Sequence, residues 1–151
     1  MQTFDMMKFV RKGWSPLPGS PRAFFSSVSH DDAAGAVVAA FGVSAGAYNV
    51  ADDEPLSRRD YVDALAEALG VAPPKFAPIW LSGLAGSLGK LMSRSQRISN
   101  RKLKKMSGWT PRYPSVREGW RATAAALQAD ADPTTGDDRS SPMSRVESAH
   151  R

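Results

Sequence analysis

The most regular stretch of the sequence spans residues 57–70 and reads SRRDYVDALAEALG. Ser57 is a good helix N-cap, and Asp60 follows three residues later as a carboxylate variant of the capping box. Gly70 supplies a left-handed helix stop. The apolar side chains at helical spacing are Tyr61, Val62, Leu65, Ala66 and Leu69. The stretch therefore predicts an amphipathic helix that packs one face on a core.

The sequence before this helix predicts three shorter elements and a connection. Residues 4–11 place apolar side chains at helical spacing, and residues 13–22 form a loop with three prolines and two glycines. Residues 23–29 are typical of a short strand. Asp31 or Asp32 then caps a helix that runs to Phe41. Residues 47–50 indicate another short strand.

The sequence after residue 70 is mainly helical in pattern. Residues 79–92 carry leucines in line, Asn100 can cap a short helix that ends at Gly108, and Ser115 caps a last helix. From residue 130 the chain is rich in Asp, Ser, Thr, Pro and Gly, which is typical of a disordered tail. We therefore predict an α-rich α+β body over residues 1–129, with about five helices and a few short strands, and a tail over residues 130–151.

Length and composition limit the chemistry that is available. The chain has 151 residues, no cysteine and only two histidines, His30 and His150. This composition excludes disulfides, thiolate catalysis and Cys-based zinc sites, and we expect no metal site. Neither a secretory signal nor a confident membrane span is visible, so the expected location is cytoplasmic. The chain is too short to carry both the cofactor lobe and the substrate lobe of a dinucleotide-dependent dehydrogenase.

The net charge of +5 conceals an uneven distribution. Residues 31–67 carry eight acidic and two basic side chains, whereas residues 90–121 carry ten basic side chains and one acidic. A segment this basic favours phosphate, nucleic acid or an acidic protein surface as its partner, or is simply a solvated face. Trp109, Tyr113 and Trp120 lie near it and could stack on single-stranded nucleic acid. Trp109 and Trp120 fit a core better, so Arg97 and Arg101 are the best anion-binding candidates.

The sequence does not match the known motifs for dinucleotide binding or for short-chain reductase catalysis. Gly83, Gly86 and Gly89 have a fingerprint-like spacing, but Pro78 and a leucine-rich helical pattern precede them where a buried strand is required. A short-chain reductase needs a Tyr-x-x-x-Lys pair, and none of the three tyrosines has a lysine four residues later. Ser29, His30 and the aspartates after them are neighbours in the chain, so they cannot form a catalytic triad among themselves.

Four segments in order resemble a known family. Residues 28–34 read VSHDDAA, residues 46–50 read GAYNV, the capped helix ends LG at 69–70, and residues 108–111 read GWTP before SVREG. This order resembles the C-terminal half of the NAD-dependent epimerase/dehydratase family, the extended short-chain dehydrogenases, over about residues 8–121. In that family a Val-His-Val-x-Asp-x-Ala segment, a Tyr-Asn-Val strand and a late Gly-Trp-x-Pro recur. The family's histidine falls on Ser29 here, with His30 beside it.

The resemblance implies a substrate-binding lobe without its Rossmann sheet. The family places its glycine-rich cofactor loop and its Ser/Tyr/Lys catalytic set in the other half, and neither has a counterpart here. Complete members use NAD(P); we expect this chain alone to bind no cofactor and to carry no catalytic residue. The resemblance carries a phosphate-binding arginine over to Arg97, and the predicted substrate-binding set is Arg97, Arg101, Ser29 and His30.

The predicted function is the substrate-binding portion of an NAD(P)-dependent epimerase, dehydratase or oxidoreductase. The parent reaction is hydride transfer on a hydroxyl or carbonyl substrate, such as a nucleotide sugar, and we expect the chain to be truncated or split and inactive alone. A separately encoded Rossmann-containing chain is a candidate partner. The alternative is a non-enzymatic module that uses residues 90–121 to bind nucleic acid or an acidic protein; of these two, nucleic acid is the less expected.

Overall fold

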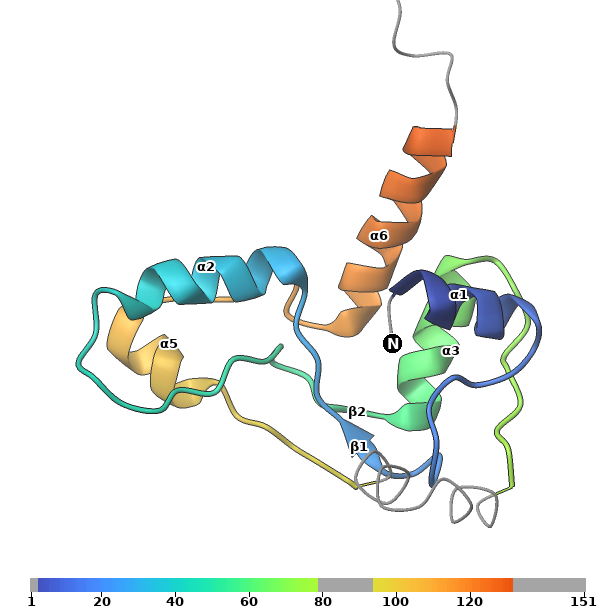
Figure 1. The fold of residues 1–151 in the computed structure, drawn as a ribbon, viewed down its shortest axis with the longest axis horizontal. Helices are drawn as coiled ribbons and strands as arrows, with labels where there is room; N and C mark the ends of the chain where they lie inside the picture. The colour runs from blue at the N-terminus through green and yellow to red at the C-terminus, as the bar shows by residue number, and fades with distance from the viewer. Residues whose placement is uncertain (1–2, 79–93, 132–151) are drawn as a thin grey trace, which may run out of the picture.

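A computed structural model describes residues 3–78 and 94–131 of the chain. Its elements are α1 (Thr3–Arg11), β1 (Phe24–Phe25), α2 (His30–Ala40), β2 (Leu56–Ser57), α3 (Arg58–Ala68), α5 (Arg101–Ser107) and α6 (Val116–Ala131). The described part is therefore helix-rich with one small sheet, as the sequence predicts. Figure 1 shows two groups of helices: α1, α3 and α6 on one side, and α2 with α5 on the other.

The hydrophobic core lies in the first group. Ser57 caps α3 by accepting a hydrogen bond from the Asp60 amide, and Gly70 follows the helix at a φ of 66°. Val62 and Leu65 of α3 are fully buried, and each contributes about 1.5–3 kcal/mol of burial free energy. Trp120 of α6 packs against Tyr61, with ring centroids 5.8 Å apart at 79°. The helix predicted at 57–70 is thus confirmed as the centre of the core.

The small sheet fixes the segment that precedes α5. β1 and β2 pair antiparallel, with Phe24 opposite Ser57. On the other side of β1, the Gln96 amide donates to the Phe24 carbonyl at 3.0 Å, and the Ile98 amide donates to Ser26 Oγ at 3.0 Å. The buried Arg58 side chain donates to the carbonyls of Pro18 and Arg94, the latter at 2.9 Å. Residues 94–98 are therefore held alongside β1.

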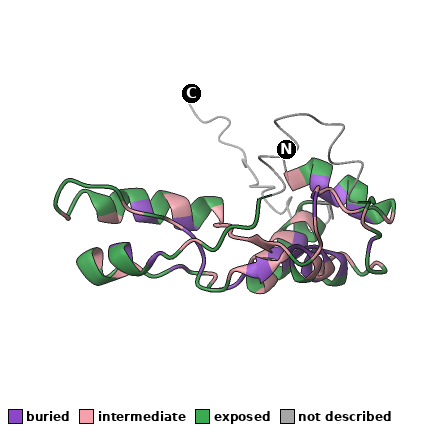
Figure 2. Ribbon diagram, turned by 90° about the horizontal axis from the view of Figure 1, so that it is seen from below, coloured by how far each residue is buried: buried purple, intermediate pink, exposed green. Residues whose placement is uncertain are grey.

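The second group of helices has little core. α2 contacts α5, and the Trp109 indole lies against Gly35, where an added Cβ would stand 3.5 Å from the indole nitrogen. Figure 2 shows that both helices are mostly exposed, whereas buried residues gather around α3. The exposed fractions of Val37, Val38 and Phe41 are 60%, 71% and 86%. This side of α2 is an apolar surface that no described residue covers.

Several predictions for the N-terminal half were wrong in detail. Ser29, not Asp31 or Asp32, caps α2, because its side chain accepts from the Asp32 amide at 3.0 Å. Asp32 instead accepts from the Arg112 amide at 2.5 Å and the Tyr113 amide at 3.3 Å, which ties α2 to the segment before α6. The strand predicted at 23–29 shortens to Phe24–Phe25. Residues 47–50 form no strand, since no described segment pairs with them.

Three other predictions concern the C-terminal part. Asn100 occupies the N-cap position before α5, but its side chain makes no capping hydrogen bond to that helix. Ser115 Oγ accepts from the Arg117 amide at 3.3 Å, as expected of a cap. α6 continues to Ala131, two residues beyond the predicted end of the body at residue 129. Residues 132–151, the helix predicted at 79–92 and Gly83, Gly86 and Gly89 lie outside the described residues.

The described residues contain neither a cluster of metal ligands nor a helix that could cross a membrane. Within residues 3–78 and 94–131, no three His, Asp or Glu side chains gather as metal ligands would. None of the helices described here combines the length and the apolar character that a membrane crossing requires.

Candidate functional site

Two hollows in the described part of the chain are each lined by several polar and charged side chains. The cationic hollow, of about 840 Å³, is lined by Asp52, Asp53, Pro55, Arg97, Ile98, Ser99, Asn100, Arg101, Lys104 and Lys105. The helical cavity, of about 410 Å³, is lined by Thr3, Met6, residues 27–31, Asp52, Tyr61, Tyr113, Ser115, Val116, Gly119, Trp120, Ala122, Thr123 and Ala126. Asp52 lines both hollows.

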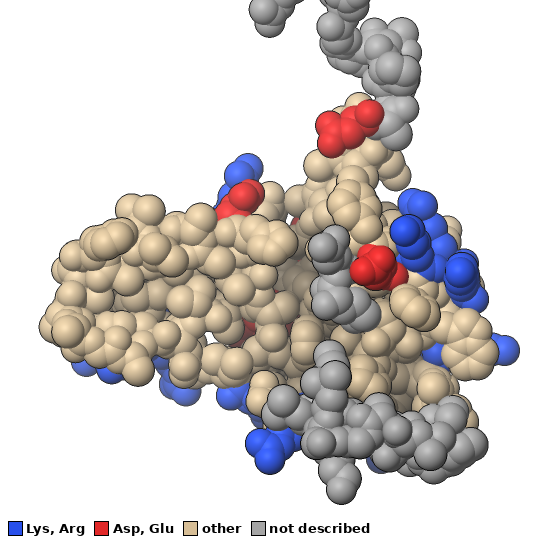
Figure 3. All heavy atoms as spheres, in the orientation of Figure 1, with Lys and Arg blue, Asp and Glu red and all other residues tan. Residues whose placement is uncertain are grey.

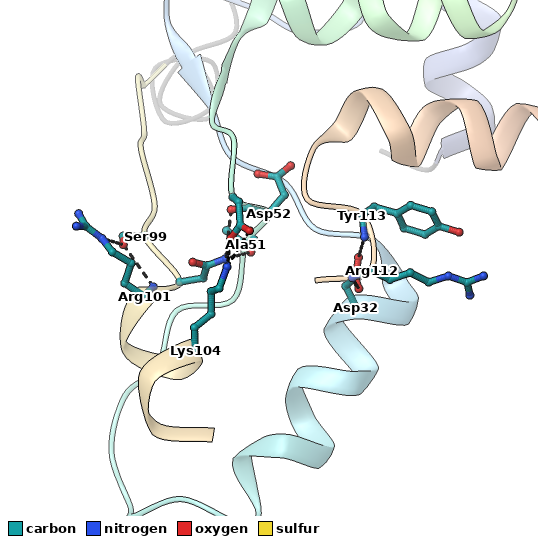
Figure 4. A network of polar contacts seen from close by, with 10 residues as sticks. Asp32, Ala51, Asp52, Ser99, Arg101, Lys104, Arg112 and Tyr113 are labelled. Carbon is teal, nitrogen blue, oxygen red and sulfur yellow. Dashed lines mark hydrogen bonds and ion pairs between the residues drawn. The ribbon is translucent and has the colours of Figure 1, made fainter. Parts of the chain in front are cut away.

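The segment beside β1 positions the arginines of the cationic hollow. Because residues 94–98 run along β1, the Arg97 guanidinium stacks on the Phe24 ring, 3.5 Å from its centroid. Arg101 begins α5, and its Nε donates to Ser99 Oγ at 3.2 Å. In Figure 4, Arg101 and Ser99 lie on the side of α5 that faces away from Asp52. Both arginines are thus oriented by local contacts.

Asn100 and Lys104 attach α5 to the acidic segment 51–53. The buried Asn100 amide donates to the Ala51 carbonyl at 2.8 Å and to Asp53 Oδ1 at 2.7 Å. Lys104 Nζ lies 2.8 Å from Asp53 Oδ2. Partial burial opposes ionisation of Asp53, but the hydrogen bonds from Lys104 and Asn100 outweigh it, and the pKa of Asp53 lies below its ordinary value. One lysine of the hollow is therefore neutralised.

The remaining cations of the hollow have no carboxylate partner among the described residues. These cations are Arg97, Arg101 and Lys105. Ion pairs elsewhere in the described chain involve Arg59, Arg117 and Arg121 instead. The hollow can consequently accept an anionic group, and two guanidinium groups suit the oxygens of a phosphate.

The floor of the helical cavity is polar and buried. Ser27 Oγ donates to Asp52 Oδ2 at 2.9 Å, and the Asp52 amide donates to the Ser27 carbonyl at 2.7 Å. The pKa of Asp52 is raised to about 6, mainly by burial and also by the nearby charges of Glu54, Asp53 and Asp32, which together outweigh the lowering effect of the Ser27 hydrogen bond. Burial also raises the pKa of Tyr61, whose ring borders the same cavity.

The four sequence-predicted site residues do not lie together. Arg97 and Arg101 line the cationic hollow, whereas Ser29 and His30 line the helical cavity. The Ser29 hydroxyl is engaged in the cap and also donates to Asp32 Oδ2 at 2.8 Å. His30 is exposed at the start of α2. No contact described here assigns a ligand-binding role to either of these two residues.

Sequence reasoning missed the residues that join the two hollows. The sequence predicts Asn100 only as a helix cap and gives Asp52 no place in a site, yet both side chains are buried and hydrogen-bonded. A run of three acidic residues, 52–54, directly after the apolar pair Val50 and Ala51 was the available signal. The expectation that Trp120 belongs to the core is confirmed, since it is 7% exposed. It is therefore not a stacking platform on the surface.

Cofactor binding by a nucleotide-binding loop finds no support in the described residues. Such a loop needs glycines between a strand and a helix N-terminus, where the backbone meets a pyrophosphate. Within residues 3–78 and 94–131, strands lead into helices through residues 26–29 and at the direct junction of Ser57 with Arg58. Neither contains a glycine. The described part does not fit the group that the family resemblance implies.

Comparisons with known proteins agree with the sequence resemblance. No family model matches the chain. It is 33% identical over 113 residues to a 3-diazoavenalumate denitrifying reductase from a Streptomyces species, covering 73% of this chain and 37% of that protein. Among solved structures, a human epimerase family protein with NADPH has a TM-score of 0.72 at 17% identity, covering 81% of this chain and 42% of that one.

A second solved structure has a similar extent of overlap. UDP-glucuronic acid 4-epimerase from Bacillus cereus, in complex with NAD, has a TM-score of 0.58 at 15% identity, with 82% of this chain and 37% of that one covered. The chain thus spans about two-fifths of the length of the proteins that it matches. Sequence similarity to part of a reductase and a fold shared with part of the epimerase structures agree with the resemblance of this chain to the C-terminal part of the NAD-dependent epimerase/dehydratase family, the extended short-chain dehydrogenases.

Proposed function

We propose that this chain is the substrate-binding portion of an NAD(P)-dependent epimerase, dehydratase or reductase. The parent reaction is hydride transfer on a hydroxyl or carbonyl group, and the proposed substrate class is a nucleotide sugar. One observation supports this class above the others: Arg97, Arg101 and Lys105 line one hollow, and no carboxylate of the described residues pairs with them. A diphosphate has the charge and the oxygen geometry that such a hollow accepts.

The proposed role of the hollow is binding and orientation. Arg97 is held against Phe24, so its charge reaches a ligand with little loss of side-chain freedom on binding. A structural relative in the same family acts on UDP-glucuronic acid, whose diphosphate is the group that we assign to this hollow. The alternative, a module for nucleic acid or an acidic protein, uses the same cations but gains no support from a reductase relative and epimerase neighbours.

We infer further that the chain alone binds no NAD(P) and turns over no substrate. The hydride is carried by the nicotinamide, which complete family members bind. The strand-to-helix connections described here contain no glycine to receive a pyrophosphate. A separately encoded Rossmann-containing chain is the proposed partner, because α2 exposes Val37, Val38 and Phe41. In Figure 3 the surface over this part of α2 shows almost no charged residues, and charged residues are likewise depleted in the cores of protein–protein interfaces.

The substrate proposal is tested by calorimetric titration of the 151-residue chain with UDP. The double variant Arg97→Gln/Arg101→Gln removes two charges and keeps polar side chains. It should weaken UDP binding by at least about 10-fold, because charge-assisted hydrogen bonds contribute about 1.5–3 kcal/mol each before screening. Lys8→Gln/Arg11→Gln, on the exposed side of α1, is the charge-matched control and should bind UDP as the parent chain does.

Two outcomes of this titration contradict the proposal. One is UDP affinity that both double variants retain equally, which would leave only a general effect of net charge. The other is affinity for a single-stranded oligonucleotide that exceeds affinity for UDP and falls steeply with salt, which would favour the nucleic-acid alternative.

A further inference from the structure

Arg58, the first residue of α3, is a buried arginine to which the proposed function gives no role. It is only 1% exposed. The positive end of the helix dipole lies at the N-terminus of a helix, so a cation at this position is disfavoured, and burial of the charge disfavours it further. Burial correspondingly lowers the pKa of Arg58. The hydrogen bonds of its guanidinium offset these effects and indicate what the residue does.

The Arg58 guanidinium joins segments that are far apart in the sequence. It donates to the carbonyl of Pro18 and to the carbonyl of Arg94, the latter at 2.9 Å. The chain before β1 is also tied to α3 through the main chain, since the Arg58 amide donates to the Ala23 carbonyl at 2.9 Å. A change of side chain leaves that main-chain bond in place. The link to the Arg94 carbonyl, by contrast, depends on the guanidinium.

The segment that starts at Arg94 carries Arg97 into the lining of the cationic hollow. Ser26 Oγ accepts from the Ile98 amide at 3.0 Å and donates to the Gln96 carbonyl at 3.5 Å. The residues on both sides of Arg97 are therefore held. In Figure 1 this part of the chain, in yellow, runs from beside β1 to the start of α5.

We infer that Arg58 and Ser26 are positioning residues for the cationic hollow: they hold segment 94–98 against β1 and so keep Arg97 oriented toward an anionic ligand. Neither residue is among those that line the hollow, so both act through Arg97 and not by contact with the ligand. A side chain that is ordered beforehand loses less freedom on binding, which raises affinity. The inference rests on the function proposed above, in which this hollow binds a diphosphate.

The binding test compares Arg58→Lys with Arg59→Lys in the 151-residue chain. Lysine keeps the charge but lacks the planar fork that can reach two carbonyls at once. Arg59 is the matched control, because its guanidinium also donates to a carbonyl, that of Pro74 at 2.9 Å, and pairs with Asp63 at 3.1 Å. Arg58→Lys should weaken UDP binding about 3- to 10-fold in calorimetric titration, as expected for the loss of one ordering hydrogen bond. Arg59→Lys should bind UDP as the parent chain does.

A measurement without ligand separates positioning from stability. NMR follows the Nε–H resonance of Arg97, which is identified by its loss in Arg97→Gln. The Phe24 ring, 3.5 Å from the guanidinium, shifts this resonance and restricts its motion on the ps–ns timescale. In folded Arg58→Lys the heteronuclear NOE of this group should fall, and its shift should move toward that of free arginine. Arg59→Lys should leave both values unchanged even where its thermal midpoint falls.

Ser26→Ala provides a second variant that changes no charge and no fully buried side chain. It removes the hydroxyl that holds Gln96 and Ile98, so it should weaken UDP binding and loosen Arg97 in the same direction as Arg58→Lys. It decides the test if Arg58→Lys does not fold, which a thermal melt establishes.

Two results would overturn the inference. One is UDP affinity and Arg97 order that the folded Arg58→Lys and Ser26→Ala variants retain in full. The other is equal weakening by Arg59→Lys, which would trace the effect to a general loss of stability. Failure of the proposed function is a separate result: the parent chain then does not bind UDP, and the Arg97 resonance alone decides whether Arg58 and Ser26 position that side chain.

Discussion

Asp52 is the residue at which the two hollows meet, and its protonation links the site to stability. Its pKa of about 6 lies above the ordinary value of 3.8 because the carboxyl is buried near other acids. The folded chain therefore holds this proton more tightly than the unfolded chain does. By linkage, the contribution of Asp52 favours folding below pH 4 and is lost as the pH rises to about 6.

The variant Asp52→Asn should remove this pH dependence. Between pH 4 and pH 7, the free energy of unfolding of the parent chain should fall relative to that of Asp52→Asn. The expected difference is on the order of 1–2 kcal/mol, after allowing for solvent screening of the shift. Urea denaturation at the two pH values measures it. Asp31→Asn, at an exposed residue of the same cavity rim, is the control and should track the parent chain. If the free energy of unfolding of Asp52→Asn changes with pH in parallel with that of the parent chain, the raised pKa of Asp52 is contradicted.

Residue-level roles in the site were only partly predictable. Arg97 and Arg101 could be selected from the sequence because charge and the order of motifs are local properties. Asp52 could not, because its burial depends on Ser27, Tyr61 and Trp120, which lie on separate elements. The role of Asp32 could not be predicted for the same reason, because the two backbone amides that donate to its side chain are 80 and 81 residues away in the sequence.

At the scale of elements, the helix that local sequence signals define was predicted correctly, whereas a strand that needs a distant pairing partner was predicted wrongly. The cap at Ser57, the stop at Gly70 and the apolar face between them are contained in one stretch, and α3 forms as predicted. The strand predicted at 47–50 needs a pairing partner, and none exists among the described residues. Strand pairing depends on a second segment whose position the local pattern does not specify.

We predict that the exposed apolar face of α2 binds the proposed Rossmann-containing partner chain. Val38→Ser/Phe41→Ser should leave the thermal midpoint nearly unchanged, because these side chains are 71% and 86% exposed. The same variant should lose co-purification of a Rossmann-containing chain that the parent retains. Phe4→Ser, at a 60% exposed side chain of α1, is the matched control and should retain the partner.

Mass spectrometry of the co-purified protein checks this prediction. Only a captured chain that carries a glycine-rich nucleotide-binding loop supports it. Retention of such a chain by the α2 variant would show that the interface lies elsewhere on the surface.

At the scale of the whole molecule, the described residues form two unequal groups of helices, and the small sheet packs against α3 of the first group. The group around α3 has a core of its own, and the group of α2 and α5 remains mostly exposed (Figure 2). The chain spans about two-fifths of the length of the proteins that it matches. An exposed apolar surface on the second group is what we expect of the substrate-binding portion that we propose, since such surfaces mark sites of interaction.

The most direct test is calorimetric titration of the 151-residue chain with NADH and NADPH, using inorganic pyrophosphate as the reference ligand. A substrate-binding portion without a nucleotide-binding loop should bind either cofactor no more tightly than pyrophosphate, because only the phosphates meet Arg97 and Arg101. Micromolar binding of NADH or NADPH that pyrophosphate does not displace would contradict the account.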